Sequence, residues 1–445
     1  MYRPVHGFPF IVFHYPPIYY LFVRAISLIV PDMLAAGRLV SGLATLAFVP
    51  LVAALVVTGW KDRPARLPAV VWGCAVAMGL CAVCIPNVRN WAVVMRVDMV
   101  AIALSLSGLL VGARSRSLGA TIAALLLCVA ALYTKQTEIA AGISVVIITF
   151  IINPRRALVA SLVAISTAIV TLILMQFLTN GGFSEHILGN NIAEMKWSIF
   201  WLRLGNEARN FLVIILILIC SYVVGSRVVS VGRRQFFIED RSLTCAAMVL
   251  THLLVSTVLL VTVAKEGSNA NYFIEWYVIG CVAIGHGLLE LSQGTRRQRN
   301  VMIGLALVFA LFVGLRPLRP MQNWLAQQNL VAQSALVRDI AEASGPVLSE
   351  NMVAILRAGK TVIMEPAITK QLTATGRWEQ GPLLEAIESR RFDFLVVRDD
   401  PDDVERWSPE AMAAIQKNYP TIEPSIPGMI QRYPSERAIN SNVRS

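Results

Sequence analysis

Charged and amide side chains stand at the ends of long apolar segments in three separate parts of this sequence. Arg96 and Asp98 precede one apolar run, and Lys135 and Glu138 separate two others. Ionisable groups are costly in lipid, so groups at such positions are candidates for function by default. A third group opens a further apolar run and consists of Lys265, Glu266, Asn269, Asn271, Tyr272 and Glu275.

These residue types suit an anionic ligand that also carries hydroxyl groups. Lysine and arginine form charge-assisted hydrogen bonds with phosphate. A carboxylate can take a proton from a hydroxyl group or bind a divalent cation. The residues expected to bind phosphate are Arg96, Lys135 and Lys265. The residues expected to contact sugar or a cation are Asp98, Glu138, Asn271 and Glu275. For any one of them, a structural ion pair or a snorkelling cap is the alternative.

The elements that must position these groups are transmembrane helices. Of the 445 residues, 56% are hydrophobic and 15% are charged, whereas about 25% of residues are charged in soluble proteins. Each apolar run is near the ~20 residues that span a bilayer, and backbone in lipid must be helical. The ten predicted spans are 38–59, 67–85, 97–113, 118–134, 136–152, 157–178, 209–229, 242–264, 271–291 and 301–315.

The positive charge indicates how these helices are oriented. Residues 1–315 hold 24 Lys and Arg against 12 Asp and Glu, whereas residues 316–445 hold 15 against 16. The basic surplus therefore belongs to the membrane half, and no basic soluble face suggests nucleic-acid binding. One set of alternate loops carries 14 Lys and Arg and the other carries 7. The positive-inside rule places the first set in the cytoplasm, so the three polar groups and the C-terminal tail are expected outside.

Residues 1–37 precede the first span and form a separate expected region. We predict a helix over 17–30 that lies on the outer surface, where Tyr19, Tyr20 and Phe22 suit the headgroup layer. A short span is the alternative. His14 lies next to this segment and could touch substrate.

Residues 316–445 read as a small soluble α/β domain. A charged helix over 321–343 is followed by short β-like runs with helices between them, which is typical of a parallel sheet. The β-like runs are PVLSE (346–350), TVIMEP (361–366) and FDFLVVRDD (392–400), and the helices are 351–359, 380–391 and 403–418. A cation site at Asp399, Asp400, Asp402 and Asp403 is conceivable, but a solvated turn is the favoured interpretation.

Two further patterns favour packing over metal binding. All seven cysteines lie in apolar segments, and the Cys81–Cys84 pair has no His or acidic partner nearby, so these thiols are expected to behave as small hydrophobes. His252 lies in the middle of a span, where a hydrogen bond within the helix bundle is expected. We therefore predict no metal site among them and no certain cofactor, although a divalent cation at the carboxylates stays open.

Several short motifs resemble a known family. The stretch HYPPIYY (14–20), followed by RLVS (38–41), resembles the "PPLYY … RL.S" pattern of bacterial GT-C transferases. This superfamily includes the protein O-mannosyltransferases, the aminoarabinose lipid A transferases and the RgtA/B/C/D-like proteins. Arg96-Val97-Asp98 resembles their "RPD", and KQT (135–137) and KEGSNANY (265–272) resemble further motifs of the RgtA-like branch. The resemblance covers most of residues 10–400 and rests on the order and spacing of these motifs.

The resemblance implies a glycosyltransferase of the bacterial plasma membrane. Such an enzyme moves a sugar from a polyprenyl-phosphate donor to a lipid, glycan or protein acceptor on the outer face. The substrate-binding residues it suggests are His14, Tyr15, Arg38, Arg96, Lys135, Lys265, Asn269, Asn271 and Tyr272. GT-C enzymes usually have another helix before the YPP region, with a catalytic acid in the loop that follows it. We expect this sequence to begin too late to contain them, through truncation, a mis-assigned start or loss of that acid. Asp98, Glu138 and Glu275 are therefore the stand-in candidates for the carboxylate.

Two other functions stay open. A transporter or flippase would place polar residues through the bilayer midplane and often has repeated halves, whereas the polar groups here stop near one surface. A non-catalytic relative would bind the lipid-linked sugar without transferring it. Both interpretations keep polyprenyl-phosphate sugar and membrane lipids as the expected partners.

Overall fold

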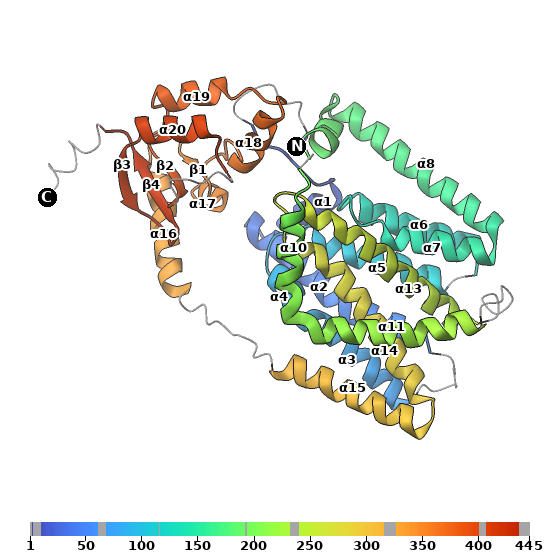
Figure 1. Ribbon diagram of the computed structural model, residues 1–445. Helices are drawn as coiled ribbons and strands as arrows, with labels where there is room; N and C mark the ends of the chain where they lie inside the picture. The colour runs from blue at the N-terminus through green and yellow to red at the C-terminus, as the bar shows by residue number, and fades with distance from the viewer. Residues whose placement is uncertain are drawn as a thin grey trace. The chain divides into compact units, whose positions relative to one another are not determined.

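The computed structural model describes residues 2, 10–60, 68–114, 116–191, 194–231, 240–315, 326–399 and 406–435. It divides into two compact units, whose elements are labelled in Figure 1. The membrane unit comprises Tyr15–Leu174 and Ala193–Arg316. The sheet unit joins three segments that are distant in sequence, Met1–His14, Met175–Ile192 and Pro317–Ser445.

The described elements of the membrane unit are helices joined by loops and turns. Its elements are α1 (Ile18–Ser27), α2 (Met33–Thr58), α3 (Ala69–Cys84), α4 (Pro86–Ala92), α5 (Asp98–Arg114), α6 (Leu118–Leu132), α7 (Ala140–Ile152), α8 (Pro154–Leu178, whose last turn belongs to the sheet unit), α10 (Trp197–Asn206), η2 (Glu207–Asn210), α11 (Phe211–Val231), α13 (Arg241–Leu259), η3 (Leu260–Ala264), η4 (Ala270–Phe273), α14 (Ile274–Ser292) and α15 (Arg296–Leu315). All ten segments predicted as spans are therefore helices, and the segment predicted before them forms α1.

The lengths of these helices differ. Among the described residues, five helical stretches are long and apolar enough to cross a membrane, or six if α3 and α4 form one bent span. The bend between α3 and α4 is 66°, where Pro86 occupies the first turn of α4 and cannot continue the preceding hydrogen-bond ladder. The helices α6 and α7 are shorter apolar helices of 15 and 13 residues.

Capping residues define where several helices begin. The Asp32 carboxylate accepts hydrogen bonds from the backbone amides of Leu34 and Ala35 and starts α2. Ser117 caps α6 in the same way, and Asp240 caps α13. Each side chain satisfies amides that have no partner within the helix.

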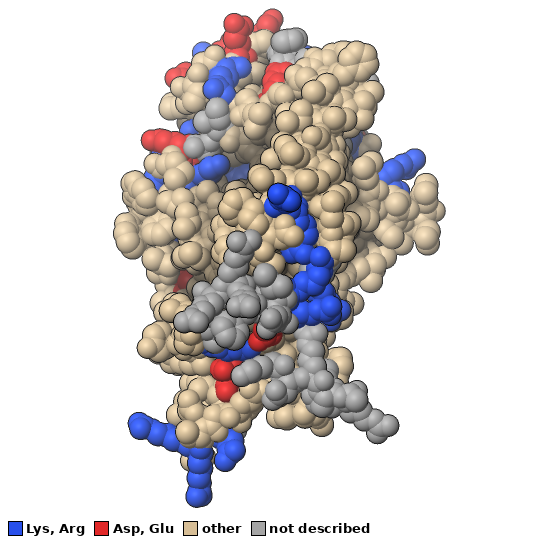
Figure 2. Space-filling view, turned by 90° about the vertical axis from the view of Figure 1, so that its right-hand side faces the viewer, with Lys and Arg blue, Asp and Glu red and all other residues tan. Residues whose placement is uncertain are grey.

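The core of the membrane unit surrounds α14, which packs against α2, α3, α11 and α13. In the most apolar part of the stretch Ala270–Ser292, which contains η4 and α14, 94% is buried inside the protein. The corresponding share for α8 is 11%. Leu162, Ile173 and Phe177 on α8 are all exposed. On the face shown in Figure 2, uncharged side chains cover most of the surface. These features identify a multi-pass membrane protein whose outer helices present apolar side chains to lipid.

The sheet unit contains a four-stranded sheet in the order β1-β2-β4-β3. Its elements are α9 (Gly182–Ser184), η1 (Glu185–Gly189), α16 (Ala326–Glu342), β1 (Leu348–Ser349), α17 (Met352–Arg357), α18 (Pro366–Ala374), α19 (Gly381–Glu388), β2 (Leu395–Arg398), α20 (Pro409–Asn418), β3 (Thr421–Pro424) and β4 (Met429–Tyr433). The strands predicted at 346–350 and 392–400 are confirmed as β1 and β2, and the helices predicted around 351–359, 380–391 and 403–418 as α17, α19 and α20. Residues 400–405 of these ranges lie outside the described residues.

Two details of the predicted sheet are wrong. The segment 361–366 is not a strand, because only Met364 forms a bridge, with Phe10, and Pro366 then starts α18. The sheet is also mixed. β1 and β2 are parallel, but β4 is antiparallel to both β2 and β3. The β3–β4 hairpin closes through Gly428, whose φ of +78° favours glycine.

Candidate functional site

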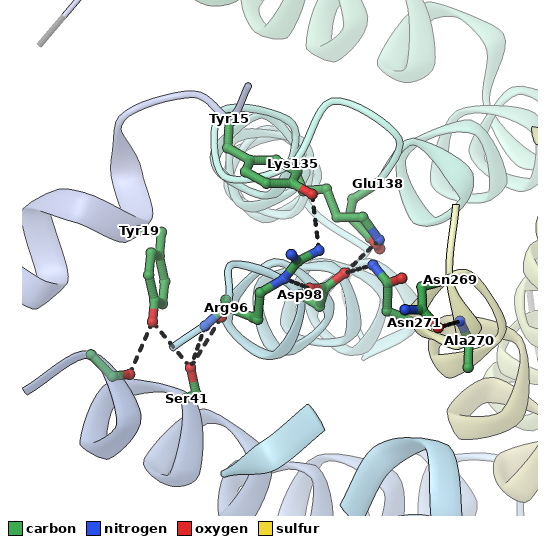
Figure 3. Close-up of polar contacts among 11 residues, drawn as sticks. Tyr15, Tyr19, Ser41, Arg96, Asp98, Lys135, Glu138, Asn269, Ala270 and Asn271 are labelled. Carbon is green, nitrogen blue, oxygen red and sulfur yellow. Dashed lines mark hydrogen bonds and ion pairs between the residues drawn. The ribbon is translucent and has the colours of Figure 1, made fainter. Parts of the chain in front are cut away.

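Asp98 is the centre of a buried polar cluster in the membrane unit (Figure 3). It begins α5, where the positive end of the helix dipole favours a carboxylate. Its Oδ1 accepts a 2.7 Å hydrogen bond from Asn271 Nδ2 and lies 3.1 Å from Lys135 Nζ. Its Oδ2 lies 3.4 Å from Arg96 Nε. The loop before α5, the turn after α6 and η4 thus converge on one carboxylate.

Lys135 bridges Asp98 to a second carboxylate. It lies in the turn between α6 and α7, and its Nζ is 3.0 Å from Glu138 Oε1 in the same turn. Nζ also lies 5.5 Å from the centre of the Tyr272 ring, a cation–π distance. Burial lowers the pKa of Lys135, but the charges of Glu138 and Asp98 outweigh burial and hold that pKa above its usual value. Lys135 therefore stays charged at neutral pH.

Arg96 is the most accessible charge of the cluster, with 33% of its side chain exposed. Its guanidinium lies 4.8 Å from the Trp91 ring and 5.6 Å from the Tyr15 ring. Its Nη2 donates a 3.0 Å hydrogen bond to the Tyr15 hydroxyl. Burial raises the pKa of Tyr15, although the charge of Arg96 opposes the shift, so the phenol keeps its proton. The two rings hold the guanidinium at the accessible edge of the cluster.

A second set of hydrogen bonds fixes the backbone that carries Arg96. The Ser41 hydroxyl donates to the Arg96 carbonyl oxygen at 3.0 Å, and the Tyr19 hydroxyl lies 3.1 Å from the same Ser41 oxygen. Tyr19 also donates to the Gly37 carbonyl oxygen at 2.9 Å. The helices α1 and α2 therefore position Arg96 through Tyr19 and Ser41, both part of the resembling motifs but not among the predicted site residues.

Glu275 extends the cluster into the bundle. Its Oε1 lies 2.8 Å from His252 Nε2 and accepts a 3.4 Å hydrogen bond from the Ser105 hydroxyl. The expected hydrogen bond of His252 within the bundle is confirmed. Helices α5, α13 and α14 thus contribute to one buried network around Glu275.

Four candidates from the sequence occupy other surroundings. Arg38 is exposed on α2, and Asn269 is exposed and caps η4 through the backbone amide of Ala270. Lys265 pairs through its backbone with Met195. Within the described parts of the chain, none of these three forms a hydrogen bond or ion pair with the Asp98 cluster. His14 belongs to the sheet unit, where its Nε2 lies 3.9 Å from Glu365.

A further buried carboxylate lies near the start of α11 and was not foreseen from the sequence. Glu207 accepts hydrogen bonds from Asn87 at 3.0 Å, Asn210 at 2.7 Å and the Tyr277 hydroxyl at 2.7 Å. Asn87 also donates to the Ala270 carbonyl oxygen at 3.2 Å. This group therefore ties α4 and α11 to η4, the element that carries Asn271.

The donor set around Asp98 does not resemble a metal centre. Lys135, Arg96 and Asn271 all direct hydrogen-bond donors at its oxygens. Throughout the described residues, no group of three or more His, Cys, Asp or Glu side chains is arranged to hold a metal ion. All seven cysteines are free thiols. Of the four aspartates predicted after β2, Asp400, Asp402 and Asp403 lie outside the described residues.

The fold matches that of known membrane proteins. No family model matches the chain, and no curated protein matches its sequence. Two solved structures are similar to it: ArnT from Cupriavidus metallidurans in the apo state, and the same protein bound to undecaprenyl phosphate. Each matches with a TM-score of 0.58 at 12% identity, covering 95% of this chain and 88% of ArnT. The predicted polytopic helical bundle with a small α/β domain is therefore confirmed, and its fold is similar to that of these two structures.

Proposed function

We propose that this chain transfers a sugar from a polyprenyl-phosphate donor to a lipid, glycan or protein acceptor at the outer face of a bacterial plasma membrane. The observation that carries the proposal is the partly exposed guanidinium of Arg96, held beside buried Lys135 and Asp98 at one end of a membrane-embedded bundle. The likeness to ArnT, which binds undecaprenyl phosphate in one of its structures, supports a lipid-phosphate ligand.

Phosphate would first meet Arg96, because Lys135 is buried with only 6% of its side chain exposed. The planar guanidinium can donate several hydrogen bonds to one anion. Lys135 supplies positive charge behind it, within a low-dielectric environment where charge interactions are strong. This arrangement stabilises the phosphate as a leaving group, because negative charge develops on it when the sugar departs.

Transfer also needs a proton acceptor. The bond between the sugar carbon and the phosphate oxygen breaks, and the phosphate keeps the electron pair. The acceptor oxygen forms the new bond to that carbon, and its proton passes to a carboxylate. Asp98 suits this role poorly, because three donors occupy its oxygens. Glu138 suits it best, because its Oε2 has no hydrogen-bond partner among the described residues.

The orientation of the chain follows from its loops. The loops rich in Lys and Arg face the cytoplasm under the positive-inside rule, so the Asp98 cluster and the sheet unit are extracytoplasmic. A lipid-linked sugar would present its headgroup at that side of the bilayer.

A non-catalytic binding protein is the second candidate. Every carboxylate of the cluster is engaged in an ion pair or hydrogen bond, Asp98 with Lys135, Glu138 with Lys135 and Glu275 with His252. Such pairs also stabilise structure alone. Binding without transfer would favour this candidate.

The test compares Arg96→Gln with Arg38→Gln in the full chain, purified and placed in lipid nanodiscs. Native mass spectrometry measures binding of undecaprenyl phosphate. Arg96→Gln should weaken binding about tenfold or more, since hydrogen bonds to charged groups contribute roughly 1.5–3 kcal/mol. Arg38→Gln, on exposed α2 surface, should bind as the unmodified chain does. Equal binding by both variants would contradict the proposed phosphate site.

Transfer is measured in the same nanodiscs. Undecaprenyl-phosphate sugars are offered singly with a membrane extract as the acceptor source, and release of undecaprenyl phosphate is detected by mass spectrometry. Release that depends on both the extract and Arg96 would support the transferase. Binding of the lipid without release from any donor would assign the chain to the non-catalytic class.

A further inference from the structure

Four arginines gather at the end of the membrane unit that lies opposite the Asp98 cluster. The helix α5 begins at Asp98 and runs to Arg114, so the loop after it lies at this opposite end. Figure 2 views the molecule from the side on which α8 begins in Figure 1, and Lys and Arg side chains gather there in one strip. We call the four residues the arginine group: Arg116 in that loop, Arg155 and Arg156 in the first turn of α8, and Arg241 at the start of α13.

A neutral backbone group supplies the contact between the loop before α6 and the start of α8. Arg156 Nη1 donates a 2.6 Å hydrogen bond to the Arg116 carbonyl oxygen. The Nε atom of Arg156 is buried and has no hydrogen-bond partner among the described residues. Arg155 and Arg241 are exposed, and neither forms an ion pair within the described parts of the chain. The arginine group therefore holds donors and positive charge that a negatively charged ligand could use.

Acidic side chains are scarce near the arginine group. In the sequence 99–184, Glu138 is the one acidic residue, and it is paired with Lys135 at the other end of the bundle. Asp240 lies at the start of α13, but its carboxylate caps that helix and lies 3.5 Å from Arg227. The carboxylates closest in sequence therefore leave much of the positive charge of the group uncompensated.

The pKa of Arg116 reflects this crowding of like charges. Burial lowers that pKa, and the positive charges of Arg241 and Arg156 lower it further, whereas Asp240 raises it. The guanidinium groups still carry their charge at neutral pH, because arginine loses its proton only at far higher pH. An anion placed among these side chains would relieve their repulsion, and arginine forms charge-assisted and often bidentate hydrogen bonds with phosphate.

The helix α8 connects the arginine group to the lipid. Leu158, Leu162 and Ile165 are exposed along it, and only 11% of its most apolar part is buried inside the protein. With α6 and α7 it also borders an apolar cavity of about 410 Å³, whose lining includes Glu138 and, on α8, Ser161. At a rise of about 1.5 Å per residue, Ser161 lies about 10 Å along the helix from its start. A ligand held at the arginine group therefore has apolar surface within reach of an attached hydrocarbon chain.

We propose that the arginine group binds the headgroup of an anionic phospholipid. The phosphate lies between Arg155, Arg156 and Arg116, and the acyl chains follow the exposed face of α8. Basic pockets between helices hold anionic headgroups on the cytoplasmic side of membranes, the side on which the positive-inside rule places these loops. A dissolved anion could use the arginines but not the apolar face beside them. The site lies at the other end of α5 from the proposed phosphate site, so it does not depend on the proposed function.

Native mass spectrometry of the purified full chain in detergent tests this site. The probes are phosphatidylglycerol, which is anionic, and zwitterionic phosphatidylcholine with the same acyl chains. The first phosphatidylglycerol should bind about tenfold or more tightly than the first phosphatidylcholine, because only the former carries a net charge for the arginines to attract. Changing Arg155→Gln and Arg156→Gln together should weaken phosphatidylglycerol binding about tenfold or more, since each arginine adds to that attraction.

The matched control changes Arg296→Gln and Arg297→Gln together. These two arginines are exposed and begin α15, on the same side of the membrane by the positive-inside rule. The control therefore removes the same charge from the same position in a helix, and its phosphatidylglycerol binding should equal that of the unmodified chain.

Three outcomes would overturn the site. Equal binding by the two double variants would show only a general attraction to anionic lipid. Equal binding of the two lipids by the unmodified chain would also contradict the site, and this comparison holds even if the Arg155 and Arg156 variant does not fold. Glycerophosphoglycerol, the headgroup without acyl chains, should bind far more weakly than the intact lipid, and equal binding would assign the arginines to a dissolved phosphate ester. No lipid-linked sugar is used, so failure here leaves the transferase proposal standing.

Discussion

Asn271 donates a 2.7 Å hydrogen bond to the Asp98 carboxylate across 173 residues of sequence. The bond joins η4 to the first residue of α5, and both side chains are buried. An amide fits this position because it offers a donor without adding charge. Its neighbour Asn269 has the same chemistry but is exposed and caps η4, so the two asparagines form a natural comparison.

Asn271→Asp should destabilise the protein, whereas Asn269→Asp should not. The first change places a second carboxylate against Asp98, and we expect a loss of about 3 kcal/mol in the free energy of unfolding, the scale of an uncompensated buried charge. Aspartate caps a helix as well as asparagine does, so Asn269→Asp should change stability by less than about 0.5 kcal/mol. Denaturant unfolding in detergent measures both. Equal stability of the two variants would mean that the Asp98–Asn271 bond is not formed.

Lys135→Met should abolish binding of undecaprenyl phosphate, and Lys265→Met should leave it nearly unchanged. Lys135 joins Asp98 and Glu138, whereas Lys265 forms a backbone bridge with Met195. Without Lys135 the two carboxylates would repel phosphate. We expect binding at least about a hundredfold weaker, or roughly 3 kcal/mol, in the same nanodisc assay. Loss of binding in Lys265→Met alone would relocate the phosphate site to the loop before η4.

The stability of the protein should fall at high pH because of Lys135. Its pKa in the folded state is raised by Glu138 and Asp98 above the ordinary lysine value, so the folded state binds this proton more tightly than the unfolded state does. That contribution is complete below about pH 10.4, the unfolded lysine value, and is lost as pH rises through the folded value.

Thermal unfolding between about pH 8 and 11.5 tests this dependence. Wild-type protein should lose stability above about pH 10.4, and Lys135→Met should show a shallower decline. Parallel curves for the two proteins would show that Lys135 is not responsible. Lys265→Met, which removes a lysine that forms no hydrogen bond or ion pair with the Asp98 cluster among the described residues and pairs through its backbone with Met195, is the matched control and should follow the wild-type curve.

The sheet unit should be reachable from outside the cell. In a background with all seven cysteines replaced, single cysteines at exposed Ser344 and at Arg297 are treated with a membrane-impermeant maleimide in intact spheroplasts. Ser344→Cys should react, and Arg297→Cys should react only after the membrane is permeabilised, because 292–300 belongs to the loops expected inside. The opposite pattern would invert the orientation and place the Asp98 cluster at the cytoplasmic surface.

The helices were predictable because lipid allows few alternatives. Long apolar runs must be helical in a bilayer, so every predicted span is a helix, and the cost of burying charge singled out Arg96, Asp98 and Lys135. Sequence position alone could not separate Lys135 from Lys265, or Asn271 from Asn269. Asn271 is a buried donor, whereas Asn269, two residues earlier, is an exposed cap of η4. Which of the two is buried depends on how η4 packs against the bundle.

Contacts between different helices could not be predicted either, because they also depend on how the helices pack. The Glu275–His252 pair depends on the rotation of α14 against α13, and the Tyr19–Ser41 contact on the approach of α1 to α2.

In the sheet unit, the strand β3 (Thr421–Pro424) could not be predicted because it contains Glu423 and Pro424, which are unusual in strands. It is tolerated because β3 lies at the edge of the sheet.

The helix α8 forms one wall of the cavity beside Glu138, through Ser161, Ala164, Ile165 and Ala168. Only 11% of its most apolar part is covered by the rest of the chain, so acyl chains of the surrounding bilayer hold this wall in place. The lipid packed against α8 should therefore influence the shape of this cavity. The choice of lipid or detergent therefore becomes an experimental variable in its own right for any measurement at Glu138.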